Sequence, residues 1–255
     1  MIEFIVIVES GADFRTATKL AERVLIEKID WLEEDNIQYL FKWCGLQEGT
    51  EYSCWKDIGK ILDSLESAGV KLPRYRGHYS KGVPLKADGA ASIKVLNLVR
   101  YLQRTRQIKA VLLIRDLDNQ PERREGLEQA RSQHIQLQPK IEIVIGTANP
   151  KREAWVLNGF TPSNEQEEKN LEEIRTQLSF DPCIESHRLR STSQEEADRM
   201  RNAKVVVDRL TGNDMERERL CWEVTSLNTL RERGVYTGLR DYICEVEQYL
   251  MLIIG

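Results

Sequence analysis

The sequence predicts an α/β protein with a mostly parallel central sheet flanked by helices and a helical C-terminal region. Up to Pro150, short apolar runs alternate with amphipathic segments, as in parallel sheets with right-handed crossovers. After Pro150 the strand signals nearly stop, while helical patterns continue. In addition, two of the apolar runs end in an acidic residue and a turn, as expected of a buried parallel strand entering a βα loop.

The predicted strands are short runs rich in apolar or β-branched residues. In chain order they are residues 2–8, 37–43, 108–114 and 141–146. The segment 37–43 is assigned to a strand from its isoleucine, tyrosine, phenylalanine and tryptophan, which favour extended structure.

The predicted helices have apolar residues at helical spacing or a polar helical composition. They are residues 14–32, 55–67, 90–104, 122–135, 164–178, 194–210, 214–232 and 239–253. Glycine and proline residues break the segment 73–88, which is predicted to be a loop. The polar stretch 161–166 marks the expected boundary between a catalytic α/β domain, residues 1–160, and a helical region, residues 161–255, packed on it.

Composition favours a soluble, cytoplasmic globular protein. The chain has 255 residues, of which 41% are hydrophobic and 31% charged, and this mixture argues against long disorder. No apolar run approaches the roughly 20 residues of a membrane span, and the N-terminus lacks a basic signal-peptide region. Five scattered cysteines without a CxxC pair indicate reduced thiols rather than disulfides or a zinc site.

Four acidic residues follow two of the predicted strands. Glu9 and Asp13 follow residues 2–8, and Asp116 and Asp118 follow residues 108–114. Ligands of open α/β sheets bind outside the carboxyl ends of the strands, so both clusters are expected to converge on one crevice. Carboxylates gathered there repel one another unless a cation lies between them. The sequence therefore predicts a Mg²⁺ or Mn²⁺ site with these four residues as ligands.

The same acids have a structural alternative, which is helix capping. Asp13 precedes a predicted helix, and Asp118 could cap the helix that follows Pro121, because their oxygens accept hydrogen bonds from free helical N–H groups. Glu9 and Asp116 fit this alternative less well, since each lies at the very end of an apolar strand.

Basic residues are concentrated in one stretch of the chain. Residues 71–109 carry a net charge of +9, whereas the whole chain carries −4, which leaves −13 for the remainder. Within this stretch a glycine-broken loop interleaves cations with a tyrosine, as a nucleic-acid groove requires. The predicted nucleic-acid-binding residues are Arg74, Arg76, His78, Tyr79 and Lys81. Lys94, Arg100 and Arg104 are expected to form only a solvated helix face.

Three segments of the chain resemble Toprim-domain proteins. The segment Val8–Asp13 is similar to the first Toprim motif, an acid after the first strand followed by glycine, and Asp116-Leu117-Asp118 is similar to the DxD motif. Residues 151–157, with their Glu-Ala-Trp core, resemble the RloB/OLD-type nuclease group of small Toprim-like proteins found beside ABC-type ATPases. The chain departs from the pattern at Ser10, which separates the acid from the glycine.

The resemblance implies a Toprim-like fold and Mg²⁺-dependent phosphodiester chemistry in antiviral defence. Asp116 and Asp118 would then hold the metal, and Glu9 would be a ligand or a general acid/base. Glu153, close behind the last predicted strand, would be a further catalytic acid, or alternatively a first-turn acid favoured by the helix dipole. The implied partners are DNA or RNA and an ABC-type ATPase, and a second copy of the chain is a further candidate partner.

The leading hypothesis is thus a metal-dependent nuclease, and the alternative is a non-catalytic nucleic-acid- or partner-binding module. A phosphatase of the haloacid-dehalogenase type also uses a DxD motif, but its nucleophilic aspartate lies on the first strand. Here the first strand ends in Glu9, which matches that class poorly.

Overall fold

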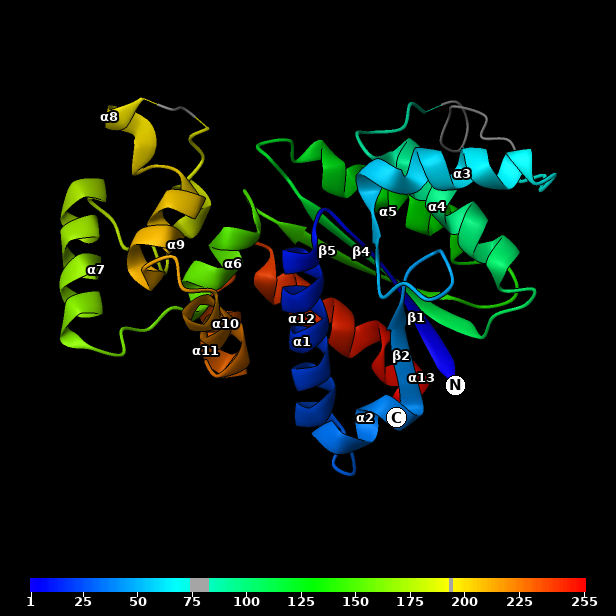
Figure 1. The fold of residues 1–255 in the computed structure, drawn as a ribbon, viewed down its shortest axis with the longest axis horizontal. Coiled ribbons are helices and arrows are strands. Elements are labelled where there is room, and N and C mark those ends of the chain that lie inside the picture. Colours follow the sequence, from blue (N-terminus) through cyan, green and yellow to red (C-terminus); the bar gives the residue numbers. More distant parts are fainter. Residues whose placement is uncertain (74–82, 193–194) are drawn as a thin grey trace.

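A computed structural model of the chain describes residues 1–73, 83–192 and 195–255. It confirms the predicted fold class, an α/β protein with a mostly parallel central sheet, flanking helices and a helical C-terminal region (Figure 1). The described residues form a five-stranded sheet of order β2-β1-β4-β5, with β3 also paired to β1, and every described strand pair is parallel. The strands are β1 Ile2–Val8, β2 Phe41–Cys44, β3 Ser53–Cys54, β4 Ile108–Asp116 and β5 Glu142–Ala148.

Helices cover both faces of the sheet (Figure 1). Alternate residues of β1 enter two separate cores: Phe4 and Val6 pack with α1 and the C-terminal helices, and Ile5 and Ile7 pack with α3, α4 and α5. Because both faces of the sheet are buried, β1 and β4 need continuous apolar sequences. This explains why both strands could be predicted from the sequence. The helices of this half are α1 Gly11–Lys28, α2 Glu34–Leu40, α3 Ile58–Ser67, α4 Gly89–Leu102 and α5 Glu122–His134.

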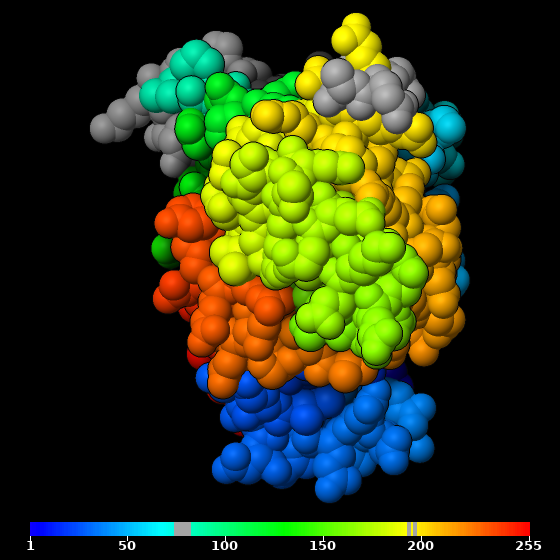
Figure 2. All heavy atoms as spheres, turned by 90° about the vertical axis from the view of Figure 1, so that its left-hand side faces the viewer, coloured from blue at the N-terminus to red at the C-terminus, as the bar shows by residue number. Residues whose placement is uncertain are grey.

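The C-terminal helices continue the first of these two cores. They are α6 Arg152–Gly159, α7 Glu165–Leu178, α8 Glu196–Arg199, α9 Ala203–Thr211, α10 Met215–Glu223, α11 Leu227–Arg233, α12 Leu239–Tyr249 and α13 Met251–Ile254. α12 packs on β5 and α1, and α7 lies against α9 on the outside of the molecule (Figure 2). The same apolar cluster runs from β1 to Leu250. The domain boundary at residue 160 stays a prediction.

The structure corrects the predicted strand 37–43. Residues up to Leu40 belong to helix α2, and only Phe41–Cys44 form a strand. Two acidic residues in the first turn of α2 stabilise the helix by interacting favourably with its dipole. The aromatic Tyr39 is 74% exposed and does not pack in the sheet. The two-residue strand β3 was not predicted.

Three predicted helices are each divided in the structure, and one of them, residues 239–253, forms α12 and α13 with Leu250 between them. Asn202 separates α8 from α9, since its side-chain oxygen accepts a hydrogen bond from the Lys204 backbone N–H at 3.0 Å. Ser226 separates α10 from α11 in the same way, with Thr229 as the donor at 3.1 Å. Such side chains compete with the helical backbone bonds and favour caps. None of the helices among the described residues has the length and apolar character needed to cross a membrane.

Candidate functional site

The two predicted acidic clusters meet at the carboxyl edge of the sheet. β1 and β4 are parallel neighbours, with Ile7 beside Leu113, so Glu9 and Asp116 leave the sheet side by side. The Glu9 carboxylate accepts a hydrogen bond from the Asp116 backbone N–H at 3.3 Å. β5 lies beside β4, with Ala148 opposite Asp116. The loop after β5 therefore brings the start of α6 to the same edge.

Asp116 lies at the centre of the acids at this edge. Its carboxyl oxygen Oδ1 accepts a hydrogen bond from the backbone N–H of Arg152, the first residue of α6, at 2.9 Å. Burial and the negative charges of Asp13, Glu9 and Glu153 raise the pKa of Asp116 to about 9. The four carboxyl groups are thus close enough to repel one another, and this repulsion together with burial favours the protonated form of Asp116.

Glu9 and Asp13 are perturbed in the same direction. Burial raises the pKa of Glu9, the nearby Asp118 and Asp13 add to the effect, and the positive charge of Arg115 opposes it. Burial also raises the pKa of Asp13, with a contribution from Glu153, although a hydrogen bond from Ser10 and the charge of Arg152 oppose the shift. Perturbed carboxyl groups in one place are characteristic of functional sites.

Ser10, which separates Glu9 from Gly11, determines the position of Asp13. Its hydroxyl caps α1 by accepting from the Ala12 backbone N–H at 3.2 Å, and it donates to the Asp13 carboxylate at 2.7 Å. The N-cap residue of α1 is therefore Ser10 and not Asp13, although Asp13 supports the cap from the first turn by bonding to the Ser10 hydroxyl and backbone. Asp13 instead lies in the first turn, 6% exposed and directed into the acidic cluster.

Asp118 and Glu153 lie at the rim of this cluster. Asp118 has a left-handed backbone with φ of 46° and forms ion pairs with Arg123 at 2.8 Å and Lys151 at 3.6 Å. It is not the cap of α5, whose N-cap residue is Pro121. Glu153 lies in the first turn of α6, 3.7 Å from the Arg152 guanidinium.

Four cations at this edge were not identified from the sequence. Arg115 directly precedes Asp116 and contacts Glu9 at 3.1 Å and Asp88 at 2.9 Å. Arg123 contacts Asp118, and its N–H also donates to the Asp116 carbonyl oxygen at 2.7 Å. Lys151 and Arg152 are the other two. The sequence signal was limited to a basic residue directly before Asp116 and one directly before Glu153, because the contacts themselves join distant segments.

Arg152 connects the acidic cluster to the C-terminal helices. Its guanidinium is 4.0 Å from Asp13 and 2.6 Å from Glu218 of α10, and it lies over the ring of Trp222 at 5.8 Å. Arg152 is 9% exposed, so this buried cation compensates part of the negative charge around Asp116.

The donor set fits a hard divalent cation, although the side chains do not form a ready ligand group. Carboxylate oxygens are the ligands that Mg²⁺ prefers, and the carboxyl groups of Asp13, Glu9 and Glu153 gather around that of Asp116 with a mutual repulsion that a cation relieves. Across the described parts of the chain, however, no group of three or more His, Cys, Asp or Glu residues is placed to hold a metal ion. Glu9 and Asp118 point to Arg115 and Arg123 instead.

The predicted nucleic-acid-binding loop cannot be placed relative to this site. Arg74, Arg76, His78, Tyr79 and Lys81 lie outside the described residues.

Of the three cations expected on a solvated helix face, Lys94 and Arg104 are exposed as predicted. Arg100 is not solvated in this way, since its guanidinium donates to the backbone carbonyls of Pro139 and His134.

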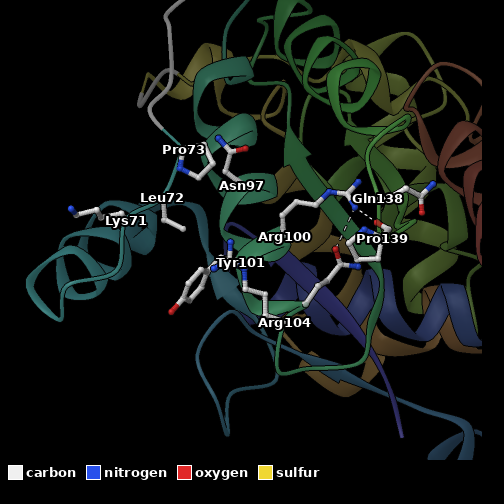
Figure 3. Close-up of a pocket in the computed structure, with 10 residues that line it drawn as sticks. Lys71, Leu72, Pro73, Asn97, Arg100, Tyr101, Arg104, Gln138 and Pro139 are labelled. Atoms are coloured by element: carbon white, nitrogen blue, oxygen red, sulfur yellow. Dashed lines mark hydrogen bonds between the residues drawn. The ribbon is translucent and has the colours of Figure 1, made fainter.

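Two neighbouring cavities lie away from the acids. A pocket of about 330 Å³ is lined by residues 71–73, the end of α4 and the segment before β5 (Figure 3). Since the end of α4 leads into β4, this pocket lies toward the amino ends of β4 and β5. Within it, the Arg104 guanidinium lies 5.2 Å from the ring centre of Tyr101. A second pocket of about 690 Å³ adjoins it between α3 and α4. Neither cavity includes a residue of the acidic cluster.

Comparisons with protein-family models, with curated proteins and with solved structures find no match to this chain. The Toprim resemblance therefore stays a prediction from the sequence motifs, and the site has to be interpreted from its own geometry.

Proposed function

We propose that the protein is a Mg²⁺- or Mn²⁺-dependent nuclease that hydrolyses phosphodiester bonds of DNA or RNA. The observation that supports this best is the gathering of Glu9, Asp13, Asp116 and Glu153 at the carboxyl edge of a parallel sheet, with the pKa of Asp116 raised to about 9. Mutual repulsion of buried carboxyl groups destabilises a fold, so such a cluster is better explained by a function than by stability.

Asp116, Glu9, Asp13 and Asp118 would hold the cation, which supplies charge neutralisation at the phosphate. The chain's own groups have separate tasks. Glu9, at the exposed rim, accepts the proton of the water whose oxygen attacks phosphorus, and the bond from phosphorus to the leaving oxygen breaks. The leaving oxygen takes a proton from solvent or from Glu153. Ser10 and the Arg152 backbone N–H keep Asp13 and Asp116 oriented.

The sequence resemblance adds the biological setting to this proposal. It supports an effector role in bacterial antiviral defence together with an ABC-type ATPase. Copurification of a tagged chain with an ATPase encoded next to it would test this part independently of catalysis.

One observation favours the alternative, a non-catalytic nucleic-acid- or partner-binding module. Glu9 and Asp118 are paired with arginines. In a binding module those pairs would be permanent, and added divalent cations would change neither activity nor stability.

A cleavage assay separates the two functions. The parent chain is incubated with single- and double-stranded DNA and RNA in Mg²⁺, in Mn²⁺ and in EDTA, beside Asp116→Asn and Glu9→Gln. A matched control is Glu3→Gln, which changes a carboxylate on the same strand at the opposite edge of the sheet. The nuclease proposal expects metal-dependent cleavage by the parent and Glu3→Gln only. Absence of cleavage by the parent on every substrate would favour the binding module.

A further inference from the structure

We propose that Arg115 and Arg123 bind the phosphate group of the substrate, and that these arginines and the divalent cation compete for Glu9 and Asp118. The inference rests on the proposed function, because phosphate is the substrate group that a nuclease implies. It adds two substrate-binding residues. It also predicts that removing either arginine raises the affinity for the cation and lowers the affinity for the substrate.

The two guanidinium groups share the same acidic partners. The Glu9 oxygen Oε1 is 3.1 Å from Arg115 and 3.9 Å from Arg123. The Asp88 oxygen Oδ2 is 2.9 Å from Arg115 and 3.5 Å from Arg123. Two positive groups are thus held close together by carboxylates between them, at the edge where Asp116 lies.

Each arginine is anchored by contacts that do not involve Glu9 or Asp118. Arg115 binds both oxygens of Asp88, at 2.9 and 3.3 Å, and lies over the ring of Trp55 at 5.5 Å. Arg123 donates to the carbonyl oxygen of Asp116 at 2.7 Å and to Gln120 at 3.3 Å. If Glu9 and Asp118 turn to a cation, both guanidinium groups keep their positions but regain free N–H donors. Phosphate oxygens match such donors in geometry and charge.

The carboxylates of these pairs are more exposed than the carboxylate of the buried pair of Arg131 with Glu245. The Glu9 and Asp118 side chains are 31% and 34% exposed, whereas Arg115 and Arg123 are 17% and 14% exposed. In the pair of Arg131 with Glu245, the exposed fractions are 16% and 11%. The carboxylates beside Asp116 are therefore within reach of ions from solvent, and a buried pair such as that of Arg131 is not.

The balance of charges at this edge favours replacement of the arginines by a cation at Glu9 and Asp118. Besides Asp116, whose protonated form is favoured, five acids lie at this edge, Glu9, Asp13, Asp88, Asp118 and Glu153, against the four cations Arg115, Arg123, Lys151 and Arg152. A divalent cation compensates for the deficit of positive charge, and the phosphate then compensates for the arginines that lose their carboxylate partners. Substrate and cation are expected to bind cooperatively for this reason.

Arg124, next to Arg123 in the chain, provides a matched control. Arg124 follows Arg123 on α5 but points away from the acids, forming ion pairs with Glu128 at 2.9 Å and Asp241 at 2.6 Å. Arg124→Gln removes the same charge from the same helical turn without touching the site.

The test uses Arg115→Gln, Arg123→Gln and Arg124→Gln in the full chain, with two measurements that do not depend on turnover. The first is the concentration of Mn²⁺ that gives half of the maximal thermal stabilisation in the absence of nucleic acid. The second is the affinity for fluorescein-labelled 20-nucleotide single-stranded DNA and RNA in Ca²⁺. Arg115→Gln and Arg123→Gln are expected to lower the Mn²⁺ midpoint about threefold or more and to weaken oligonucleotide binding about tenfold. Arg124→Gln should change neither.

Three outcomes would overturn the inference. Loss of Mn²⁺ affinity in Arg115→Gln and Arg123→Gln would mean that the arginines maintain the shape of the site. Values equal to those of Arg124→Gln, in a parent that cleaves, would make the pairs purely structural while the nuclease function stands. A parent that neither responds to Mn²⁺ nor cleaves would refute the function itself, and the competition with it.

Because a glutamine variant can fail to fold, Arg123→Lys is measured as well. It keeps the positive charge but loses the planar fork of donors. A Mn²⁺ midpoint like that of the parent, together with weakened oligonucleotide binding, is expected. Parent-like oligonucleotide affinity would contradict the assignment.

Discussion

The two ends of β1 place similar carboxylates in opposite surroundings. Near the amino end, Glu3 forms ion pairs with Arg106 at 2.6 Å and Lys42 at 3.0 Å. Burial alone would raise the pKa of Glu3, but the hydrogen bonds and charges of Arg106 and Lys42 outweigh it and lower the pKa. At the carboxyl end, burial raises the pKa of Glu9, and the neighbouring acids Asp118 and Asp13 add to it despite Arg115.

The two ends differ in how their charges are balanced. Charges at the amino end are paired with fixed partners, whereas the carboxyl end has an excess of acids. At the amino edge, the Arg106 guanidinium also donates to the carbonyl oxygens of Leu46 and Gly45, at 2.9 and 3.1 Å, so its donors have fixed partners. At the carboxyl edge the acids outnumber the cations. A ligand of positive charge is expected where acids are in excess at the carboxyl ends of parallel strands.

The largest expected effect is on catalysis at the carboxyl edge. Asp116→Asn should lower metal-dependent cleavage at least about 100-fold, because even outer-shell residues of metal sites contribute roughly 10–100-fold. Glu3→Gln should leave the rate per folded molecule unchanged. Initial rates on the preferred nucleic acid measure both. Equal losses in the two variants would remove the functional distinction between the ends of β1.

The next effect is on stability at the amino edge. Glu3→Gln should cost about 2 kcal/mol of unfolding free energy, since Arg106 is then left mostly buried without its carboxylate. Urea denaturation at pH 7 measures the change. A cost below about 0.5 kcal/mol, the range of surface substitutions, would show that the Glu3 pairs are as weak as exposed ones.

Divalent cations should stabilise the protein through the carboxyl edge alone. At tenfold excess over its dissociation constant, Mg²⁺ or Mn²⁺ should add about 1.4 kcal/mol to the folded state, seen as a higher melting temperature. Asp116→Asn should lose this response, and Glu3→Gln should keep it. An unchanged response in Asp116→Asn would place the cation elsewhere on the protein.

The smallest effect is a difference in how the stability contributed at the two ends of β1 depends on pH, measured in EDTA. The pKa of Asp116 is about 9 in the folded chain, above its usual value, so its favourable contribution is complete at low pH and is lost as pH rises from about 4 to 9. Asp116→Asn should therefore gain stability over the parent by at least about 1 kcal/mol between pH 5 and pH 8.

Glu3 has the opposite sign, because its pKa is lowered. Its contribution is present above the usual glutamate value and is lost as pH falls through the folded pKa. The cost of Glu3→Gln should therefore shrink below pH 4. Urea midpoints of the parent and both variants across this range test the pair, and curves of equal slope would refute it.

The fold class and the position of the acids along the chain could be predicted from the sequence. The runs 2–8 and 108–114 are apolar because both faces of β1 and β4 are covered, and a run of that kind identifies its own carboxyl end. Glu9 and Asp116 could be placed at one edge for this reason. The segment 37–43 was assigned wrongly up to Leu40, since short segments with aromatic residues suit a helix or a strand and the packing decides.

The surroundings of each acid, in contrast, follow from the three-dimensional fold. The bond from the Asp116 N–H to Glu9 spans 107 positions, and that from Arg115 to Asp88 spans 27. No local pattern encodes such contacts, because they depend on strand order and on the loop that each strand enters. Glu3 and Glu9 are the same residue type, one on β1 and the other directly after it. Their opposite pKa shifts follow from the neighbours that the fold brings to each end.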